Sequence, residues 1–283
     1  MAAVLWKIAG QTFDLTERSM IMGVLNVTPD SFSDGGKFFD RTRAVRHGRQ
    51  MISDGAQIID VGGESTRPGA DAVAANEELT RVAPVVANLR ASGAGLISID
   101  TTKASVARAA LDAGATIIND VTGGRGDSTM FSLAADRGAA LIVMHMQGTP
   151  RTMQDAPHYD DVVGEIREFF RHQYAQAIES GVDPMAIAFD PGIGFGKTLK
   201  HNLELLRCLP ELRIEDRPLV VGVSRKSFLG KILGSAEADD RLAPTVALTG
   251  LLRERSANVL RVHDVKPNVA ALRVTEALLH PAA

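Results

Sequence analysis

The sequence predicts a (β/α)8 barrel, in which eight parallel strands alternate with helices. One observation is a recurring unit of helix end, glycine, short link and apolar strand, found at residues 52–61, 111–120, 134–145 and 178–190. A second is the count of eight, because four further apolar strands occur at residues 21–25, 96–100, 219–224 and 259–264. A third is the length of 283 residues, which accommodates a fold of about 250 residues.

Composition agrees with this class and bounds the domain organisation. Hydrophobic residues make up 45% of the chain and aromatic residues only 5%, so the core must consist mainly of Ala, Val, Ile and Leu, as in parallel sheets. An open, doubly wound sheet is the alternative, but the even repeat and the count of eight favour the barrel. Residues 3–16 predict a hairpin that turns at Ala9-Gly10 and closes the barrel bottom. No linker interrupts the chain, so residues 1–283 are expected to form one domain.

Charge and cysteine content narrow the partners and the compartment. The net charge is −3 and there is no extended basic cluster, which argues against nucleic-acid binding. Cys208 is the only cysteine, so an intrachain disulfide is impossible and a reducing cytoplasm is expected. The first residues lack the basic and apolar regions of a secretory signal. No apolar run approaches the roughly 18 residues of a membrane helix, so no membrane partner is expected.

Polar side chains stand at the ends of all eight predicted strands. In a barrel these ends meet at one mouth, where active sites lie. They are Asn26, Asp60, Asp100, Asn119, His145, Asp190, Ser224 followed by Arg225 and Lys226, and Arg261 with His263. Any single one could simply cap the following helix. Together they indicate a polar site, in which several carboxylates need a ligand or cation to offset their repulsion.

Three cationic groups predict an anion site on one side of this mouth. Arg261 and His263 lie two apart on a strand and therefore share a face. Lys226 follows the seventh strand at the start of a helix, where backbone N–H groups also favour anions. Barrels frequently bind phosphate near strands seven and eight.

Two other kinds of site are not supported. The stretch DPGIGFGKT (190–198) resembles a P-loop, but Pro191 occupies the first glycine position and Lys197 the third glycine of a dinucleotide motif. The seven histidines form no H-x-x-x-H pair and have no cysteine partner, so a zinc site is not expected.

Seven motifs together carry a family resemblance. NVTPDSFSDGG, DVGGESTRPGA, SIDTTK, INDVTGG, FDPGIGFGKT, SRKSFLG and RVHDV occur in this order within residues 21–279. In this respect the chain resembles the dihydropteroate synthases. Members of that family join the pyrophosphate ester of a 6-hydroxymethyl dihydropterin to p-aminobenzoate, releasing pyrophosphate, in folate synthesis. Sulfonamides compete for their p-aminobenzoate site, and the resemblance implies Mg²⁺ as cofactor.

The resemblance implies a role for each matching residue. The pterin pocket would contain Asp100, Asn119, Asp190, Lys226 and Met144. The pyrophosphate site would contain Asn26, Thr66, Arg67, Arg261 and His263, with Asn26 as the Mg²⁺ ligand. The p-aminobenzoate pocket would contain Phe32, Thr66, Arg67, Pro68, Phe195, Ser224 and Lys226. The residues closest to the chemistry would be Asp34, Arg67 and Lys226.

The resemblance implies a function for two loops, residues 27–36 and 63–70. The turn-rich, acidic stretch 27–36 is unusually long for a connection inside a compact domain. With residues 63–70 it would close over the bound substrates and exclude water. Asp34 would then stabilise a pterin carbocation, although on the residues alone it is an ordinary turn residue before two glycines. A homodimer is implied, with residues 241–253 as a candidate interface helix.

Three other functions remain open on the sequence. A methyltetrahydrofolate-using methyltransferase would share the pterin acids but would have no use for Arg261, His263 and the acidic loop. A Schiff-base aldolase would use Lys226 as its nucleophile. A non-catalytic pterin-binding protein would bind pterin without turnover.

Overall fold

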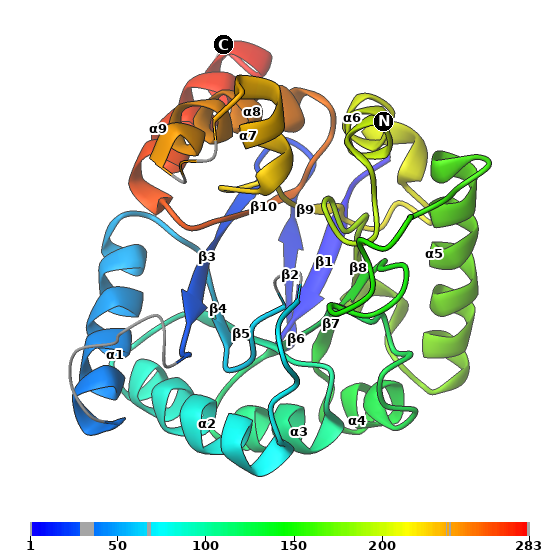
Figure 1. The fold of residues 1–283 in the computed structure, drawn as a ribbon. Helices are drawn as coiled ribbons and strands as arrows, with labels where there is room; N and C mark the ends of the chain where they lie inside the picture. The colour runs from blue at the N-terminus through cyan, green and yellow to red at the C-terminus, as the bar shows by residue number, and fades with distance from the viewer. Residues whose placement is uncertain (1, 29–36, 67–68, 236, 238, 282–283) are drawn as a thin grey trace.

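Eight parallel strands form the centre of the molecule in the computed structural model, which describes residues 2–28, 37–66, 69–235, 237 and 239–281 (Figure 1). The strands are β3 (Met20–Asn26), β4 (Ile58–Gly62), β5 (Leu96–Asp100), β6 (Ile117–Asp120), β7 (Ala140–Met144), β8 (Ile187–Asp190), β9 (Val220–Gly222) and β10 (Val259–Val262). They are ordered β8-β7-β6-β5-β4-β3-β10-β9. A parallel bridge between Phe189 and Leu219 joins the two ends of the sheet, so the predicted barrel is confirmed.

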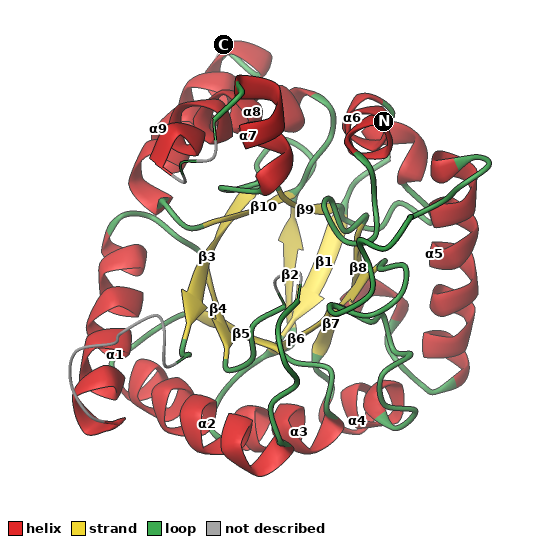
Figure 2. Ribbon diagram, viewed as in Figure 1, coloured by secondary structure: helices red, strands yellow, loops and turns green. Residues whose placement is uncertain are grey.

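Helices cover the outside of this barrel and lie between successive strands (Figure 2). They are α1 (Lys37–Ser53), α2 (Ala75–Ala91), α3 (Ala104–Asp112), α4 (Met130–Arg137), α5 (Val162–Glu179), α6 (Leu199–Arg207), α7 (Ser227–Leu233), α8 (Leu242–Glu254) and α9 (Val265–Leu279). Local chemistry fixes several of their ends. Gly138 adopts φ 59° at the end of α4, and Asp161 caps the start of α5 by accepting from the Gly164 N–H.

Alternation along the strands divides the core into two layers. Outward-facing residues such as Ile21, Leu25 and Ile59 pack against the helices in the larger cluster. Inward-facing residues such as Met22 and Ile142 fill the lower barrel in a second cluster. The parallel strands are buried on both faces and therefore read as continuous apolar runs rather than alternating ones.

The N-terminal hairpin closes the bottom of the barrel, as predicted. Its strands are β1 (Leu5–Ile8) and β2 (Gln11–Asp14), joined by Ala9 and Gly10 at φ 49° and 77°. Trp6 is fully buried within the inner cluster, and its Nε1–H donates to the Ala186 carbonyl at 2.9 Å. The lower end is thereby filled, which leaves the opposite end as the one open to ligands.

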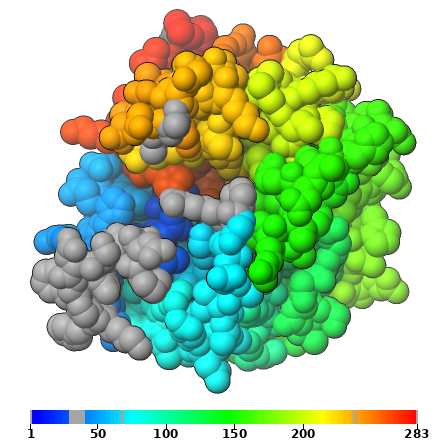
Figure 3. All heavy atoms as spheres, viewed as in Figure 1, coloured from blue at the N-terminus to red at the C-terminus, as the bar shows by residue number. Residues whose placement is uncertain are grey.

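The open end is the face where the loops after the strands gather. In the space-filling view, atoms from early and late parts of the chain lie at the bottom of a hollow on this face (Figure 3). No helix among the described residues is long and apolar enough to cross a membrane.

Candidate active site

An arginine and two buried carboxylates form the centre of the barrel mouth. Arg261, on β10, donates from Nε to Asp60 Oδ2 at 2.6 Å and from Nη2 to Asp100 Oδ2 at 2.7 Å. Asn119, on β6, donates from Nδ2 to the same Asp60 oxygen at 3.1 Å. Four strands that are scattered along the sequence therefore meet in one hydrogen-bonded cluster.

Burial and neighbouring charge perturb this cluster. Burial raises the pKa of Asp100 to about 7, Asp60 adds to the shift, and Arg261 opposes it. Burial alone would lower the pKa of Arg261, but Asp60 and Asp100 outweigh it and raise that pKa. In the described part of the chain, the second carboxylate oxygens of Asp60 and Asp100 are buried without a hydrogen-bond partner. Buried acceptors are normally satisfied, so the cluster is ready to receive a ligand that carries N–H donors.

A third carboxylate, Asp190, and a lysine, Lys226, lie on the β8 and β9 side of the mouth. Asp190 is only 5% exposed, and its Oδ1 accepts from the Gly192 N–H at 2.7 Å. Burial raises its pKa, against the opposing effects of Lys226 and the Gly192 N–H. Burial lowers the pKa of Lys226 to about 8, and Asp190 opposes that shift. The two groups therefore stabilise each other's charged forms across the mouth.

An apolar wall adjoins this pair. Val121, Met144, Met146 and Met153 form a separate hydrophobic cluster, and Phe195 packs against it. The Lys226 ammonium lies 4.6 Å from the centroid of the Phe195 ring, within cation–π distance. Its Nζ also donates to the Ile193 carbonyl. A flat aromatic molecule could bind here between an apolar surface and a cation.

Ser224 and His263 form a pair on the β9 and β10 side. The backbone N–H of His263 donates to Ser224 Oγ at 3.1 Å, and the ring Nδ1 of His263 lies 3.1 Å from the same oxygen. The sequence assigned these residues to two different subsites. The structure places the two side chains in direct contact with each other. Their assignment to two separate subsites stays a prediction.

Asn26 and Thr66 occupy the β3 and β4 side of the mouth. Asn26 is half-buried and pairs in register with Gly62, which in turn pairs with Asp100. A Cβ added to Gly62 would contact both Asn26 Oδ1 and Asp100, so the glycine keeps a gap between them. Thr66 is half-buried in the loop that follows β4. The described residues contain no group of three or more Asp, Glu, His or Cys that could hold a metal.

Comparison with known proteins identifies the family. A family model described as "Pterin binding enzyme" matches residues 22–263. Dihydropteroate synthase of Synechocystis sp. is 47% identical over 270 residues, covering 95% of this chain and 93% of the relative. The Escherichia coli K12 enzyme is 46% identical over 270 residues, covering 95% of each. The chain belongs to the dihydropteroate synthase family.

Solved structures of dihydropteroate synthases share the fold over almost the whole chain. The Xanthomonas albilineans protein with 4-aminobenzoic acid aligns with a TM-score of 0.92 and 42% identity, covering 99% of this chain and 100% of that one. The same organism's protein in complex with 7,8-dihydropteroate gives 0.87 and 39%, covering 98% and 100%. A Yersinia pestis protein with a sulfonamide drug complex gives 0.91 and 42%, covering 97% and 99%.

Four residues that the sequence assigned to the site lie outside the described part of the chain. They are Phe32, Asp34, Arg67 and Pro68. Their roles therefore stay predictions. The described candidates come together at the mouth in four groups: the Arg261 cluster, the Asp190–Lys226 pair with the Met144–Phe195 wall, the Ser224–His263 pair, and Asn26 with Thr66 on the β3 and β4 side.

Sequence reasoning gave no role to two buried polar residues at or beside the barrel mouth. Asp60 stood among the polar strand ends but received no role, although it orients both Arg261 and Asn119. Lys197 was noted only as a departure from a glycine motif, yet it is 3% exposed with its Nζ 3.1 Å from His145 Nδ1. Strand-end position was the available signal for Asp60. No local pattern distinguishes Lys197 from a surface lysine.

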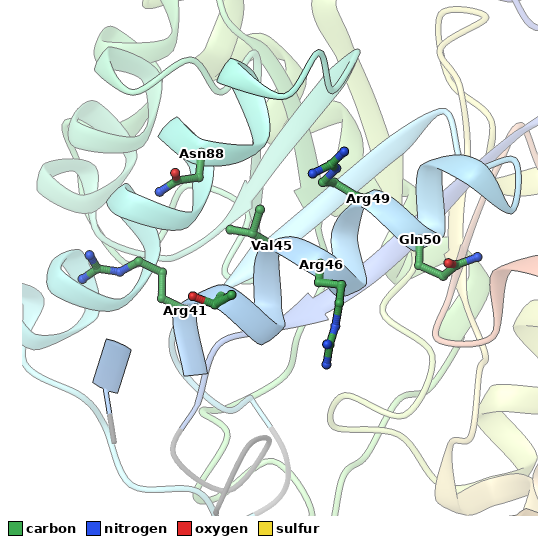
Figure 4. Close-up of a pocket in the computed structure, with 7 residues that line it drawn as sticks. Arg41, Val45, Arg46, Arg49, Gln50 and Asn88 are labelled. Atoms are coloured by element: carbon green, nitrogen blue, oxygen red, sulfur yellow. The ribbon is translucent and has the colours of Figure 1, made fainter. Parts of the chain in front are cut away.

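A separate cavity of about 630 Å³ lies on the outer helical layer. Its lining comes from α1 and α2: Arg41, Thr42, Val45, Arg46, Arg49, Gln50 and Asn88. The three arginine side chains point away from one another rather than into a common centre (Figure 4). None of the active-site candidates that the structure describes lines this cavity, whose walls come from the outer helices α1 and α2.

Proposed function

We propose that this protein condenses 6-hydroxymethyl-7,8-dihydropterin pyrophosphate with p-aminobenzoate, giving 7,8-dihydropteroate and pyrophosphate in folate biosynthesis. The observation that carries the proposal is the pair of buried carboxylates beside Arg261, Asp60 and Asp100, each with an oxygen that has no hydrogen-bond partner among the described residues. A heterocycle rich in N–H donors matches these acceptors. Membership of the dihydropteroate synthase family makes a pterin the natural choice.

The pterin is proposed to lie between Asp100 and Asp190. A pterin edge carries an amino group beside a ring N–H, a donor pair that a carboxylate such as Asp190 accepts in two parallel bonds. Asp100 and Asn119 would satisfy the other edge. Lys226 would donate to a ring nitrogen or oxygen, and Met144 would contact the ring face.

The second substrate is proposed to lie against Phe195 and Lys226. Phe195 offers an aromatic surface, and the neighbouring ammonium offers a partner for a carboxylate or a ring face. Thr66, Ser224 and the predicted loop residues Phe32, Arg67 and Pro68 would complete this pocket. A sulfonamide of similar shape would compete there.

The pyrophosphate is proposed to face Asn26, Arg261 and His263, with Thr66 and Arg67 from the neighbouring loop. Mg²⁺ takes oxygen ligands and keeps several waters, so one Asn26 amide oxygen beside the Gly62 gap fits it as an anchor. When bound, Mg²⁺ would neutralise charge on the leaving pyrophosphate. Arg261 would add positive charge on the same side.

The reaction is proposed to proceed by departure of pyrophosphate before the new bond forms. Breaking the carbon–oxygen bond leaves a pterin carbocation, and the aniline nitrogen then attacks that carbon and releases a proton. Asp34 is proposed to stabilise the cation, since a carboxylate aimed at developing positive charge is preorganised electrostatic catalysis. The loops 27–36 and 63–70 are proposed to close over the mouth and keep water from the cation.

The proposal includes the setting in which the enzyme works. Residues 1–283 are proposed to act as one pterin-binding domain, in the cytoplasm, without a nucleic-acid or membrane partner. A homodimer is proposed through the late helices. In support, Leu251 on α8 and Val274 and Leu278 on α9 are 51%, 63% and 78% exposed.

The test is pyrophosphate release by purified protein with Mg²⁺ and the pterin pyrophosphate, with and without p-aminobenzoate. Release coupled to dihydropteroate formation would support the synthase. Tight pterin binding without release would instead leave a pterin-binding protein. As a companion, Asp190→Asn should weaken pterin binding by about 1.5–3 kcal/mol, the contribution of a hydrogen bond to a charged group. An unchanged dissociation constant by calorimetry would contradict its assignment.

A further inference from the structure

Lys197 is a buried lysine that the proposed chemistry does not use. Its side chain is 3% exposed, and no carboxylate among the described residues lies within ion-pair distance of it. Its Nζ instead contacts the Phe195 carbonyl at 3.0 Å, His145 Nδ1 at 3.1 Å and the His145 carbonyl at 3.3 Å. Burying an amine costs free energy unless its hydrogen bonds are satisfied, and these three contacts satisfy it.

The three contacts persist in either charge state of the amine. Burial lowers the pKa of Lys197 well below the usual lysine range, and Lys226 adds to the shift. A protonated Lys197 would donate to both carbonyls and to His145 Nδ1. A neutral Lys197 would donate to the carbonyls and accept from Nδ1–H. Burial also lowers the pKa of His145 to about 2, so the imidazole is neutral and can serve either arrangement.

Lys197 thereby joins the loop after β7 to the loop after β8, which already lie in close contact. A Cβ on Gly192 would lie 1.9 Å from the His145 carbonyl oxygen, and one on Gly196 would lie 2.5 Å from the Gln147 carbonyl oxygen. The Tyr159 hydroxyl also donates to the Gly196 carbonyl at 2.9 Å. The β8 loop therefore has little room to shift once the lysine is in place.

Phe195 is the residue through which this connection reaches the active site. Its carbonyl accepts from Lys197, while its ring packs against the hydrophobic cluster that contains Met144 and faces the Lys226 ammonium. We propose that Lys197 is a positioning residue that fixes the Phe195 wall and so sets affinity for the aromatic amine substrate without touching it. This inference rests on the proposed function, because it assigns the wall to p-aminobenzoate.

The test is the variant Lys197→Met, which keeps the length and apolar stem but removes the donors. The KM for p-aminobenzoate should rise roughly three- to ten-fold, the range expected when a side chain must be ordered on binding. The dissociation constant for the pterin should change less than about two-fold, since no hydrogen bond or ion pair among the described residues joins Lys197 to Asp190 or Asp100 and the Asp190 charge acts on Lys197 only through space. Lys200→Met is the matched control, because Lys200 is an exposed lysine on α6, just after the loop that holds Lys197.

A double-mutant cycle decides whether the effect passes through Phe195. In a Phe195→Leu background, Lys197→Met should raise the KM for p-aminobenzoate by less than about two-fold, because coupled sites are not additive. Full additivity, or an equal loss of pterin affinity, would overturn the proposal. Should Lys197→Met not fold, Lys197→Gln carries a shorter NH2 group that cannot make all three contacts, and it should show the same selective rise; no rise would overturn the proposal. The wild-type protein is assayed first, and if it forms no dihydropteroate the proposed function itself has failed.

Discussion

Replacing Arg261 by methionine tests the charge balance at the centre of the barrel mouth. The change leaves Asp60 and Asp100 facing each other without their shared cation. These side chains are 0% and 8% exposed, and the Arg261 side chain is 21% exposed. Removing one partner of a buried ion pair costs about 3–5 kcal/mol, because the remaining charge stays buried.

The expected loss in the free energy of unfolding for Arg261→Met lies at the lower end of that range. Asp100 already has a pKa of about 7, so in the variant it can take up a proton at modest cost and relieve the repulsion. With about 2.1 cal/mol/K of unfolding entropy per residue over 283 residues, a loss of about 3 kcal/mol lowers Tm by about 5 °C. The stability loss of Arg261→Met should grow from pH 6 to pH 8, because protonating Asp100 becomes harder as the pH rises.

Thermal and urea unfolding would measure the effect against a matched control. Arg225 makes a similar two-bond pair with Asp264, at 2.8 and 2.6 Å, but its side chain is 35% exposed. Arg225→Met should therefore cost only about 1 kcal/mol or less. Adding Asp60→Asn to Arg261→Met should recover part of the stability. A loss for Arg261→Met no larger than that of Arg225→Met would refute the reasoning.

Three further outcomes follow from the site and its loops. Asp100 should make Tm fall as the pH rises from about 4 to about 7, because its raised pKa lets the folded carboxyl hold a proton over that window while the unfolded one does not. Asp100→Asn should remove this contribution, and an unchanged dependence of Tm on pH would count against the raised pKa. In wild type, kcat/KM should fall above about pH 8 as Lys226 loses its proton, and Lys226→Met should lack this limb in a pH–rate profile. Gly192→Ala should cost more than about 3 kcal/mol in urea unfolding, since its φ is 65° and its Cβ would clash with the His145 carbonyl. Gly138→Ala, with φ 59° and open space, should cost only about 1 kcal/mol, and equal losses would contradict the clash.

The sequence by itself determined the elements of this fold. Strands such as residues 96–100 and 259–262 are short apolar runs, and the glycines at 55, 114, 138 and 181 adopt positive φ where the repeat places them. The hairpin turn at Ala9-Gly10 was also predicted from the sequence. These features depend on neighbours along the chain, because period and turn chemistry are local. The same locality placed Asp100, Asn119, Asp190 and Arg261 at strand ends, and hence at one mouth.

Tertiary structure alone decided how those side chains pair. The contact of Arg261 with Asp60 spans 201 positions in sequence, and that of Lys197 with His145 spans 52. Neither has a local signature, since distances across a barrel depend on register, strand order and the side chains that fill its centre. The sequence therefore predicted a cationic Arg261 for pyrophosphate but not its pairing with two carboxylates. It also gave no sign that Lys197 is buried, because burial is a property of the packed fold and not of the residue.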